Sequence, residues 1–133
     1  MHEIISHLYK NGIYGNWEIQ SNETHTNGVA RLASLFAGEF GMASWGNVLG
    51  ALHDKGKESY AFQQYIKKVS GYEPNAKVPS EHHHAYVGAI LARKLYGKSS
   101  ENFFINQIWS HHTGLHDSDE LSSERSELCK EIP

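Results

Sequence analysis

The sequence predicts an all-α fold, formed by one compact helical bundle. Apolar residues recur three or four positions apart through nearly the whole chain, and glycine or serine interrupts them where helices are expected to end. Strand-like alternation is confined to two short stretches, Ile4 to Tyr9 and Trp17 to Ile19. With 133 residues, of which 39% are hydrophobic, the chain can form a single core. We therefore expect one domain over residues 1–133.

The first half of the chain predicts three helices that end at glycines. The first runs from about residue 22 to residue 40, before Gly41. Its apolar positions, which should share a buried face, are Val29, Leu32, Ala33, Phe36 and Phe40. The second helix spans about residues 43–53, and the third spans about residues 59–69, before Gly71. His25 lies four positions before Val29, so we expect it to point inward as well.

The second half predicts further helices after a loop at residues 72–79, which contains two prolines. A helix from Ser80 to about Tyr96 carries Gly88, which we expect to permit close packing near His84. The next helix should lead to His111. The N-terminal caps expected in this half are Ser80, Ser99 or Ser100, and Asp117, the last in a capping box with Glu120.

Composition and charge exclude several classes of protein. No apolar run approaches the length of about 20 residues that a membrane span needs, so we expect a soluble, cytoplasmic protein without a membrane partner. Cys129 is the only cysteine, which excludes a disulfide framework and a cysteine-based zinc site. The net charge of −3 provides no general attraction for nucleic acid. Lysines are concentrated in one stretch, either as a solvated helix face or near a phosphate site, at Lys55, Lys57, Lys67 and Lys68.

Histidines around an adjacent His53–Asp54 pair predict a metal site. His25 precedes the pair, and the runs His82–His84 and His111–His112 follow it. Imidazole and carboxylate are ligands that suit divalent transition metals, and a carboxylate can bridge two ions. Apolar or small residues lie four positions from His25, His53 and His84, so these side chains should point toward a common axis. For any one of them alone, a buried histidine that contacts only carbonyl groups is the alternative.

Four segments of the chain carry the candidate ligands within longer motifs. They are His25-Thr-Asn-Gly-Val-Ala, Leu52-His53-Asp54-Lys55-Gly56-Lys57 with Phe62-Gln63, His84-Ala-Tyr-Val-Gly88-Ala89, and Ser110-His111-His112-Thr113-Gly114-Leu115. Together they resemble the HD nuclease domain of the CRISPR-associated type I interference nuclease-helicase. The resemblance covers about residues 22–116. The His-Asp pair alone would indicate only the HD phosphohydrolase superfamily. Lys57, the Phe-Gln element and the His-His-Thr-Gly element narrow it to the nuclease.

The resemblance implies a compact HD-domain helical bundle with a metal site at its centre, acting as a metal-dependent nuclease. Its substrate would be single-stranded DNA exposed by an RNA-guided surveillance complex. A helicase domain, in the same or a separate chain, would feed that strand to the site. Residues 1–133 would then be the amino-terminal part of a longer nuclease-helicase. Up to two divalent ions are implied, and manganese, iron, cobalt, nickel and zinc all suit such ligands.

The resemblance also assigns roles to individual residues. The first ion would be held by His25, His53 and Asp54, with His7 in reserve. The second would be held by Asp54, His84, His111 and His112, so that Asp54 bridges the two ions. Lys57 would approach the scissile phosphate. Within the triple run, His82 and His83 would instead face solvent or the groove.

One departure from the family pattern leaves other functions open. A late aspartate that completes the family's site has no clear counterpart, although Asp117 or Asp119 could supply it. The chain could therefore be a catalytically incomplete fragment that acts as a binding module. The other alternative is an HD phosphohydrolase that acts on nucleotides or cyclic dinucleotides.

Overall fold

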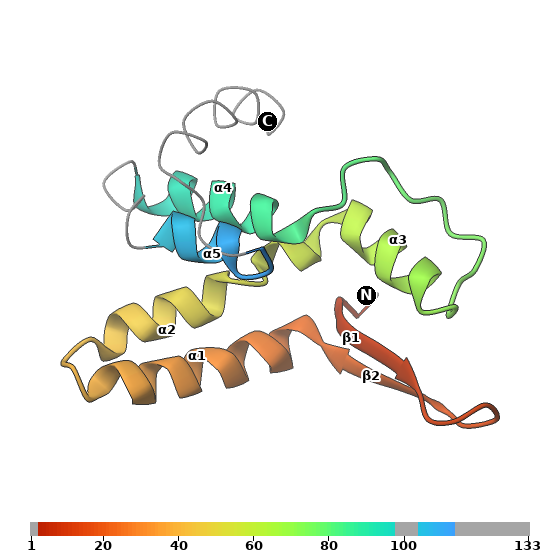
Figure 1. Ribbon diagram of the computed structural model, residues 1–133, viewed down its shortest axis with the longest axis horizontal. Coiled ribbons are helices and arrows are strands. Elements are labelled where there is room, and N and C mark those ends of the chain that lie inside the picture. Colours follow the sequence, from red (N-terminus) through yellow and green to blue (C-terminus); the bar gives the residue numbers. More distant parts are fainter. Residues whose placement is uncertain (1–2, 98–103, 114–133) are drawn as a thin grey trace.

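A computed structural model describes residues 3–97 and 104–113, and these residues are mostly helical with one small sheet (Figure 1). The sheet is an antiparallel hairpin of β1 (Ile5–Lys10) and β2 (Trp17–Ser21), in which Leu8 pairs with Ile19. The prediction of a purely all-α fold is therefore wrong in this region. The two short alternating stretches form strands because they pair with each other, which neither stretch shows on its own.

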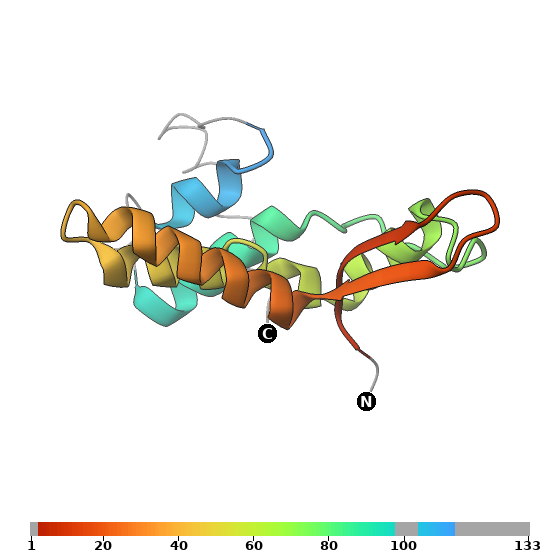
Figure 2. The same ribbon diagram turned by 90° about the horizontal axis from the view of Figure 1, so that it is seen from below.

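The helices follow the hairpin in chain order. They are α1 (Asn22–Gly38), α2 (Ala43–Leu52), the 3-10 helix η1 (Lys55–Glu58), α3 (Tyr60–Val69), α4 (His84–Tyr96) and α5 (Asn106–Ser110). Helices α1 and α2 form an antiparallel pair, and α4 lies beside α5 (Figure 1). Strand β2 leads directly into α1. The hairpin extends away from α1 and α2, and β1 contacts α3 (Figure 2). No helix among the described residues is long and apolar enough to cross a membrane.

Small residues join α1 to α2. A Cβ atom added at Gly50 would lie 2.5 Å from the Cα of Ala30, so only glycine permits this approach of the two backbones. The buried apolar side chain of α1 is accordingly Ala30, while Phe36 in this helix and Phe40 just after it are 66% and 84% exposed. The predicted buried face of this helix is therefore wrong for its large residues. Helix α2 packs instead on the small residues of α1, where its Gly46 and Gly50 meet Ala33 and Ala30.

The start of α4 also differs from the prediction. The helix begins at His84 rather than after Ser80. The ring Nδ1 of His82 lies 3.3 Å from the carbonyl oxygen of Pro79 and 3.1 Å from that of Ser80. Side-chain hydrogen bonds of this kind offer the backbone an alternative to the first helical turn. The predicted glycine stops are confirmed, since Gly41, Gly71 and Gly97 all have positive φ and end or follow helices. The expected caps at Ser99 or Ser100 and at Asp117 lie outside the described residues.

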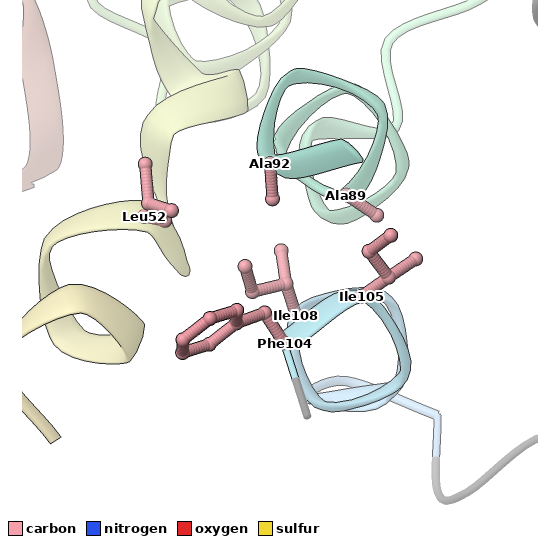
Figure 3. Close-up of a cluster of buried hydrophobic side chains, with 6 residues drawn as sticks. All are labelled: Leu52, Ala89, Ala92, Phe104, Ile105 and Ile108. Atoms are coloured by element: carbon pink, nitrogen blue, oxygen red, sulfur yellow. The ribbon is translucent and has the colours of Figure 1, made fainter. Parts of the chain in front are cut away.

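The apolar core lies between the end of α2 and the pair α4–α5 (Figure 3). It consists of Leu52, Ala89, Ala92, Phe104, Ile105 and Ile108. A Cβ atom at Gly88 would lie 3.2 Å from the Cγ2 of Ile108 and 3.3 Å from the carbonyl oxygen of Leu52. The close packing predicted at Gly88 is thus confirmed. It holds α4 against the C-terminal end of α2, immediately before His53 and Asp54.

Two further contacts bring η1 against its neighbours. A Cβ atom at Gly56 would lie only 1.8 Å from the carbonyl oxygen of His84, so this glycine lets η1 touch the first residue of α4. On the other side, Gln63 Oε1 accepts a hydrogen bond of 3.0 Å from Ile5 N, and its Nε2 donates to the carbonyl oxygens of Ile5 and Lys57, both at 2.8 Å. The strand β1, the helix η1 and the helix α3 therefore meet at one glutamine.

Candidate metal centre

Asp54 lies between α2 and η1, and its two carboxylate oxygens face different groups. The residue is 3% exposed. Around Oδ2 lie His25 Nε2 at 3.0 Å, His53 Nε2 at 3.2 Å and Lys57 Nζ at 2.8 Å. Around Oδ1 lie the Nε2 atoms of His84 and His111, both at 3.3 Å. We call the first group, together with His7, the Oδ2 side, and the second, together with His112, the Oδ1 side.

Backbone carbonyl groups fix the orientation of two imidazole rings. His53 Nδ1 lies 2.7 Å from the carbonyl oxygen of Gly50, and His111 Nδ1 lies 2.5 Å from that of Ile108. A carbonyl oxygen only accepts hydrogen bonds, so each Nδ1 carries a proton and donates it. Each Nε2 is then turned toward Asp54 and provides the lone pair when the ring is neutral. This is the arrangement by which proteins hold histidine ligands of metals.

Two ring nitrogens on the Oδ1 side also lie close to each other. His84 Nε2 and His112 Nε2 are 3.0 Å apart. Together with Asp54 and His111, each of these residues offers one ligand atom, and all four atoms lie within 4.8 Å of one another. On the other side, His7, His25 and Asp54 form a group of the same kind, and the rings of His7 and His25 are 4.6 Å apart.

The surroundings of Asp54 Oδ1 indicate whether these residues fit a metal ion. It is buried and makes no hydrogen bond, although two ring nitrogens lie 3.3 Å from it. A buried carboxylate oxygen without a partner is costly. Ring nitrogens that converge on such a carboxylate oxygen are the donor set that divalent transition metals prefer. The residues present therefore fit a metal ion, and they fit it best on the Oδ1 side.

The electrostatic environment keeps Asp54 ionised. Burial alone would raise its pKa, but interactions with His111, His53, His84 and Lys57 outweigh burial and hold that pKa well below its usual range. Burial lowers the pKa of His7, His25 and His112. Burial acts in the same direction on His53, but its hydrogen bonds with Asp54 and Gly50 prevail, and its pKa is raised.

Lys57 is held inside the site. Its side chain is 7% exposed, and Nζ lies 2.8 Å from Asp54 Oδ2 and 3.2 Å from Ser6 Oγ. The ammonium group also lies 5.8 Å from the centre of the Phe62 ring. In this position it neutralises Asp54. Its approach to a scissile phosphate stays a prediction.

The structure brings together all six predicted metal-binding residues, His25, His53, Asp54, His84, His111 and His112. His7, the reserve candidate for the first ion, lies beside His25. Their action as ligands stays a prediction. The neighbours His82 and His83 do not belong to the ligand groups around Asp54, and they stack on each other, with ring centres 5.1 Å apart. Asp117 and Asp119 lie outside the described residues.

Sequence reasoning missed the polar residues that support the site. Ser6 contacts the ammonium group of Lys57, and Gln63 donates a hydrogen bond to the backbone carbonyl oxygen of Lys57. The buried Asn22 donates from Nδ2 to the carbonyl oxygen of Asp54 at 3.4 Å. Gln63 appeared in the resemblance only as part of a motif. For Ser6 and Asn22 the sequence holds no signal, because their partners lie 51 and 32 positions away.

Comparison with known protein families identifies a match over nearly the whole chain. The sequence model of a family described as "Cas3, HD domain" matches residues 1–132, nearly the whole chain. No match was found among proteins of curated function.

Proposed function

The chain belongs to the family of Cas3 HD domains, and from this premise we propose that it is a metal-dependent nuclease that cuts single-stranded DNA during CRISPR interference. Membership by itself supports an HD-type nuclease in a CRISPR context. The observation that carries the finer proposal is the division of Asp54, whose two oxygens face two separate sets of nitrogens. A carboxylate in that position suits the bridge between two ions.

The proposed ligands follow from that division. His25, His53 and Asp54 would hold one divalent ion, with His7 beside them, and Asp54, His84, His111 and His112 would hold the other. When bound, two such ions supply Lewis-acid stabilisation of phosphoryl charge and lower the pKa of water near them. Manganese, iron, cobalt, nickel and zinc all suit this donor set.

The protein's own residues would prepare the site for this chemistry. The carbonyl groups of Gly50 and Ile108 fix the rings of His53 and His111, so their nitrogens need little reorganisation when ligands bind. Lys57 adds positive charge beside Asp54. We propose that this charge also stabilises the substrate phosphate, which would require the ammonium group to exchange Asp54 for a phosphate oxygen.

The partners implied by the family belong to the same proposal. They are a single DNA strand, a helicase domain in the same or a separate chain, and an RNA-guided surveillance complex, all in the cytoplasm. Two rival functions use the same site differently. A nucleotide or cyclic-dinucleotide phosphohydrolase would act on small substrates, and an incomplete fragment would bind metal weakly and act as a binding module.

The test compares substrates and variants with added manganese, cobalt or nickel. Single-stranded DNA, duplex DNA, mononucleotides and cyclic dinucleotides are incubated with the 133-residue chain and with any longer protein that contains it. We expect cleavage of single strands only, with loss of activity in Asp54→Asn. Glu58→Gln is the matched control, because it makes the same change in an exposed carboxylate of η1 that pairs with Lys55.

Each alternative gives a different result. Hydrolysis of mononucleotides with no cleavage of polymers would support the phosphohydrolase. Weak metal uptake without turnover on any substrate would support the binding module. Equal activity of Asp54→Asn and Glu58→Gln would refute the proposed metal centre.

A further inference from the structure

A pocket lined by aromatic rings lies directly beside the Oδ1 side. Its volume is about 400 Å³, and its ring-bearing walls come from α3, from the segment before α4, from α4 itself and from α5. Among the rings are those of Phe62, Tyr65, His82, His83, Tyr86 and Trp109. His84 and His112, which offer ligand atoms to the proposed metal ion, also line it. A group in this pocket would therefore lie next to whatever the metal centre holds.

Flat rings on one wall form a continuous stack. Tyr65 and His82 are stacked at 4.4 Å with 19° between their planes, and His82 and His83 are stacked at 5.1 Å with the same angle. His83, at the outer end of the stack, is exposed. On another wall, Tyr86 and Trp109 meet edge to face at 5.5 Å. The pocket is thus bounded by π-surfaces of two orientations.

The charge and size of the pocket suit a nucleobase. None of the described residues that line it is an aspartate or glutamate, so no carboxylate there repels a phosphate-bearing ligand. Successive bases of single-stranded nucleic acid stack on aromatic side chains largely without regard to sequence, because every base has a π-face. A contact of that type suits a DNA strand of any sequence.

We propose that this aromatic pocket binds a base of single-stranded DNA, namely the base next to the phosphate held at the metal centre. The inference rests on the proposed function and deepens it. It assigns Tyr65, His82 and His83 to substrate binding. These two histidines of the triple histidine run do not belong to the ligand groups around Asp54. Stacking would fix the nucleotide, while His84 and His112 face its phosphate.

The experiment measures binding without metal, so that it does not depend on cleavage. The 133-residue chain in EDTA is titrated with a short single-stranded oligonucleotide that carries 2-aminopurine, whose fluorescence is quenched by stacking. We expect Tyr65→Leu to weaken binding about tenfold or more, as removal of a base-stacking ring does elsewhere. Tyr65→Phe should restore it, because the ring is sufficient. Tyr60→Leu is the control, since Tyr60 lies on the same helix, is 70% exposed and does not line the pocket.

An abasic strand of equal length tests whether the base is what binds. We expect it to bind weakly and to be insensitive to Tyr65→Leu. Circular dichroism melting of each variant shows that the fold is retained, and His82→Leu provides a second substitution should Tyr65→Leu unfold the chain. The inference is overturned if the abasic strand binds as tightly as the normal strand, or if Tyr65→Leu and His82→Leu both behave like Tyr60→Leu.

The same titrations distinguish this inference from the proposed function. Base-dependent oligonucleotide binding in a protein that never cleaves DNA with added metal would support the pocket and refute the nuclease. Metal-dependent cleavage with an affinity and a KM that are unaffected by loss of Tyr65 and His82 would support the nuclease and refute the pocket. Binding of thymidine monophosphate as tight as that of the oligonucleotide would overturn the assignment to a DNA strand in favour of a mononucleotide site.

Discussion

The two sides of Asp54 differ in how the buried negative charge of its carboxylate is neutralised. On the Oδ2 side, the ammonium group of Lys57 lies 2.8 Å away and is itself held by Ser6. On the Oδ1 side there is no such cation among the described residues, and the oxygen makes no hydrogen bond. One oxygen is therefore neutralised by the protein, while the other still lacks a positive partner. A single divalent ion should bind on the Oδ1 side first.

The difference follows from the parts of the chain that build each side. The Oδ2 side is formed by β1, α1 and residues next to Asp54, including Lys57 three positions later. The Oδ1 side is formed by the first residue of α4 and by the residues that follow α5. A second ion on the Oδ2 side would have to share Asp54 with the ammonium group, and two cations so close repel each other.

The largest effect should come from removing the carboxylate of Asp54. Asp54→Ala leaves the ammonium group of Lys57 buried without its partner, which costs about 3–5 kcal/mol of unfolding free energy. The double variant Asp54→Ala/Lys57→Met should recover most of this loss, because an apolar side chain of similar size replaces the charge. Urea denaturation of the metal-free proteins measures both. A loss below about 1 kcal/mol in Asp54→Ala would show that Lys57 is not neutralised by Asp54.

The second prediction compares ligands on the two sides. Metal-free protein should bind close to one manganese or zinc ion per chain, measured by isothermal titration calorimetry. His84→Ala should weaken that binding by at least about 100-fold, the upper range seen when only a supporting residue is lost. His25→Ala should change it by no more than about threefold, because Lys57 already neutralises Oδ2. His83→Ala is the control. Two ions of equal affinity would contradict the difference between the sides.

A third prediction tests how the Oδ1 side is positioned. Gly56→Ala places a Cβ atom 1.8 Å from the carbonyl oxygen of His84, so α4 must move away from η1. We expect a loss of about 1–3 kcal/mol in unfolding free energy and weaker binding of the first ion. Gly28→Ala, inside α1, meets nothing within 4 Å. It should stabilise the protein by about 0.5–1 kcal/mol. Equal effects of the two alanines would mean that η1 and α4 do not touch as described.

The smallest effect should be a pH dependence of the metal-free protein. Burial lowers the pKa of His7, His25 and His112, so the folded state binds fewer protons than the unfolded state just below pH 6.5. Their contribution to stability is therefore lost as the pH falls below 6.5 toward their folded pKa values. His53 has a raised pKa, so its contribution is present below pH 6.5 and is lost as the pH rises through its folded pKa.

Thermal melting between pH 5 and 8 separates these contributions. His7→Gln and His25→Gln, both on the Oδ2 side, should each flatten the fall in stability at low pH. His53→Gln should instead flatten the decline above pH 6.5. If every variant keeps the profile of the parent protein, the groups that titrate lie elsewhere in the chain.

The sequence predicted features that depend on neighbouring residues better than features that depend on long-range contacts. The glycine stops at Gly41, Gly71 and Gly97 could be predicted because each depends only on the backbone around it. The candidate site could be assembled from the His-Asp pair and the resemblance. The burial of Lys57 could not, because it depends on Ser6, 51 positions away. The exposure of Phe36 and Phe40 was equally hidden, since periodicity marks an apolar face without showing which face the neighbouring helix covers.

The hydrogen bonds of Gln63 have a consequence for the motions of the native protein. Strand β1 is fastened to the helical part by the hydrogen bonds of this side chain with Ile5 and by the contact of Ser6 Oγ with Lys57 Nζ, and Ser6 and His7 follow directly after Ile5. A fluctuation that opens these bonds would withdraw both residues together while the helices stay folded. Such sub-global openings have their own free energy, below that of complete unfolding. Amide protons of β1 should therefore exchange with solvent sooner than those of the buried segment of α4 around Ala89 and Ala92. Protection of β1 by added metal would then report directly on occupancy of the Oδ2 side.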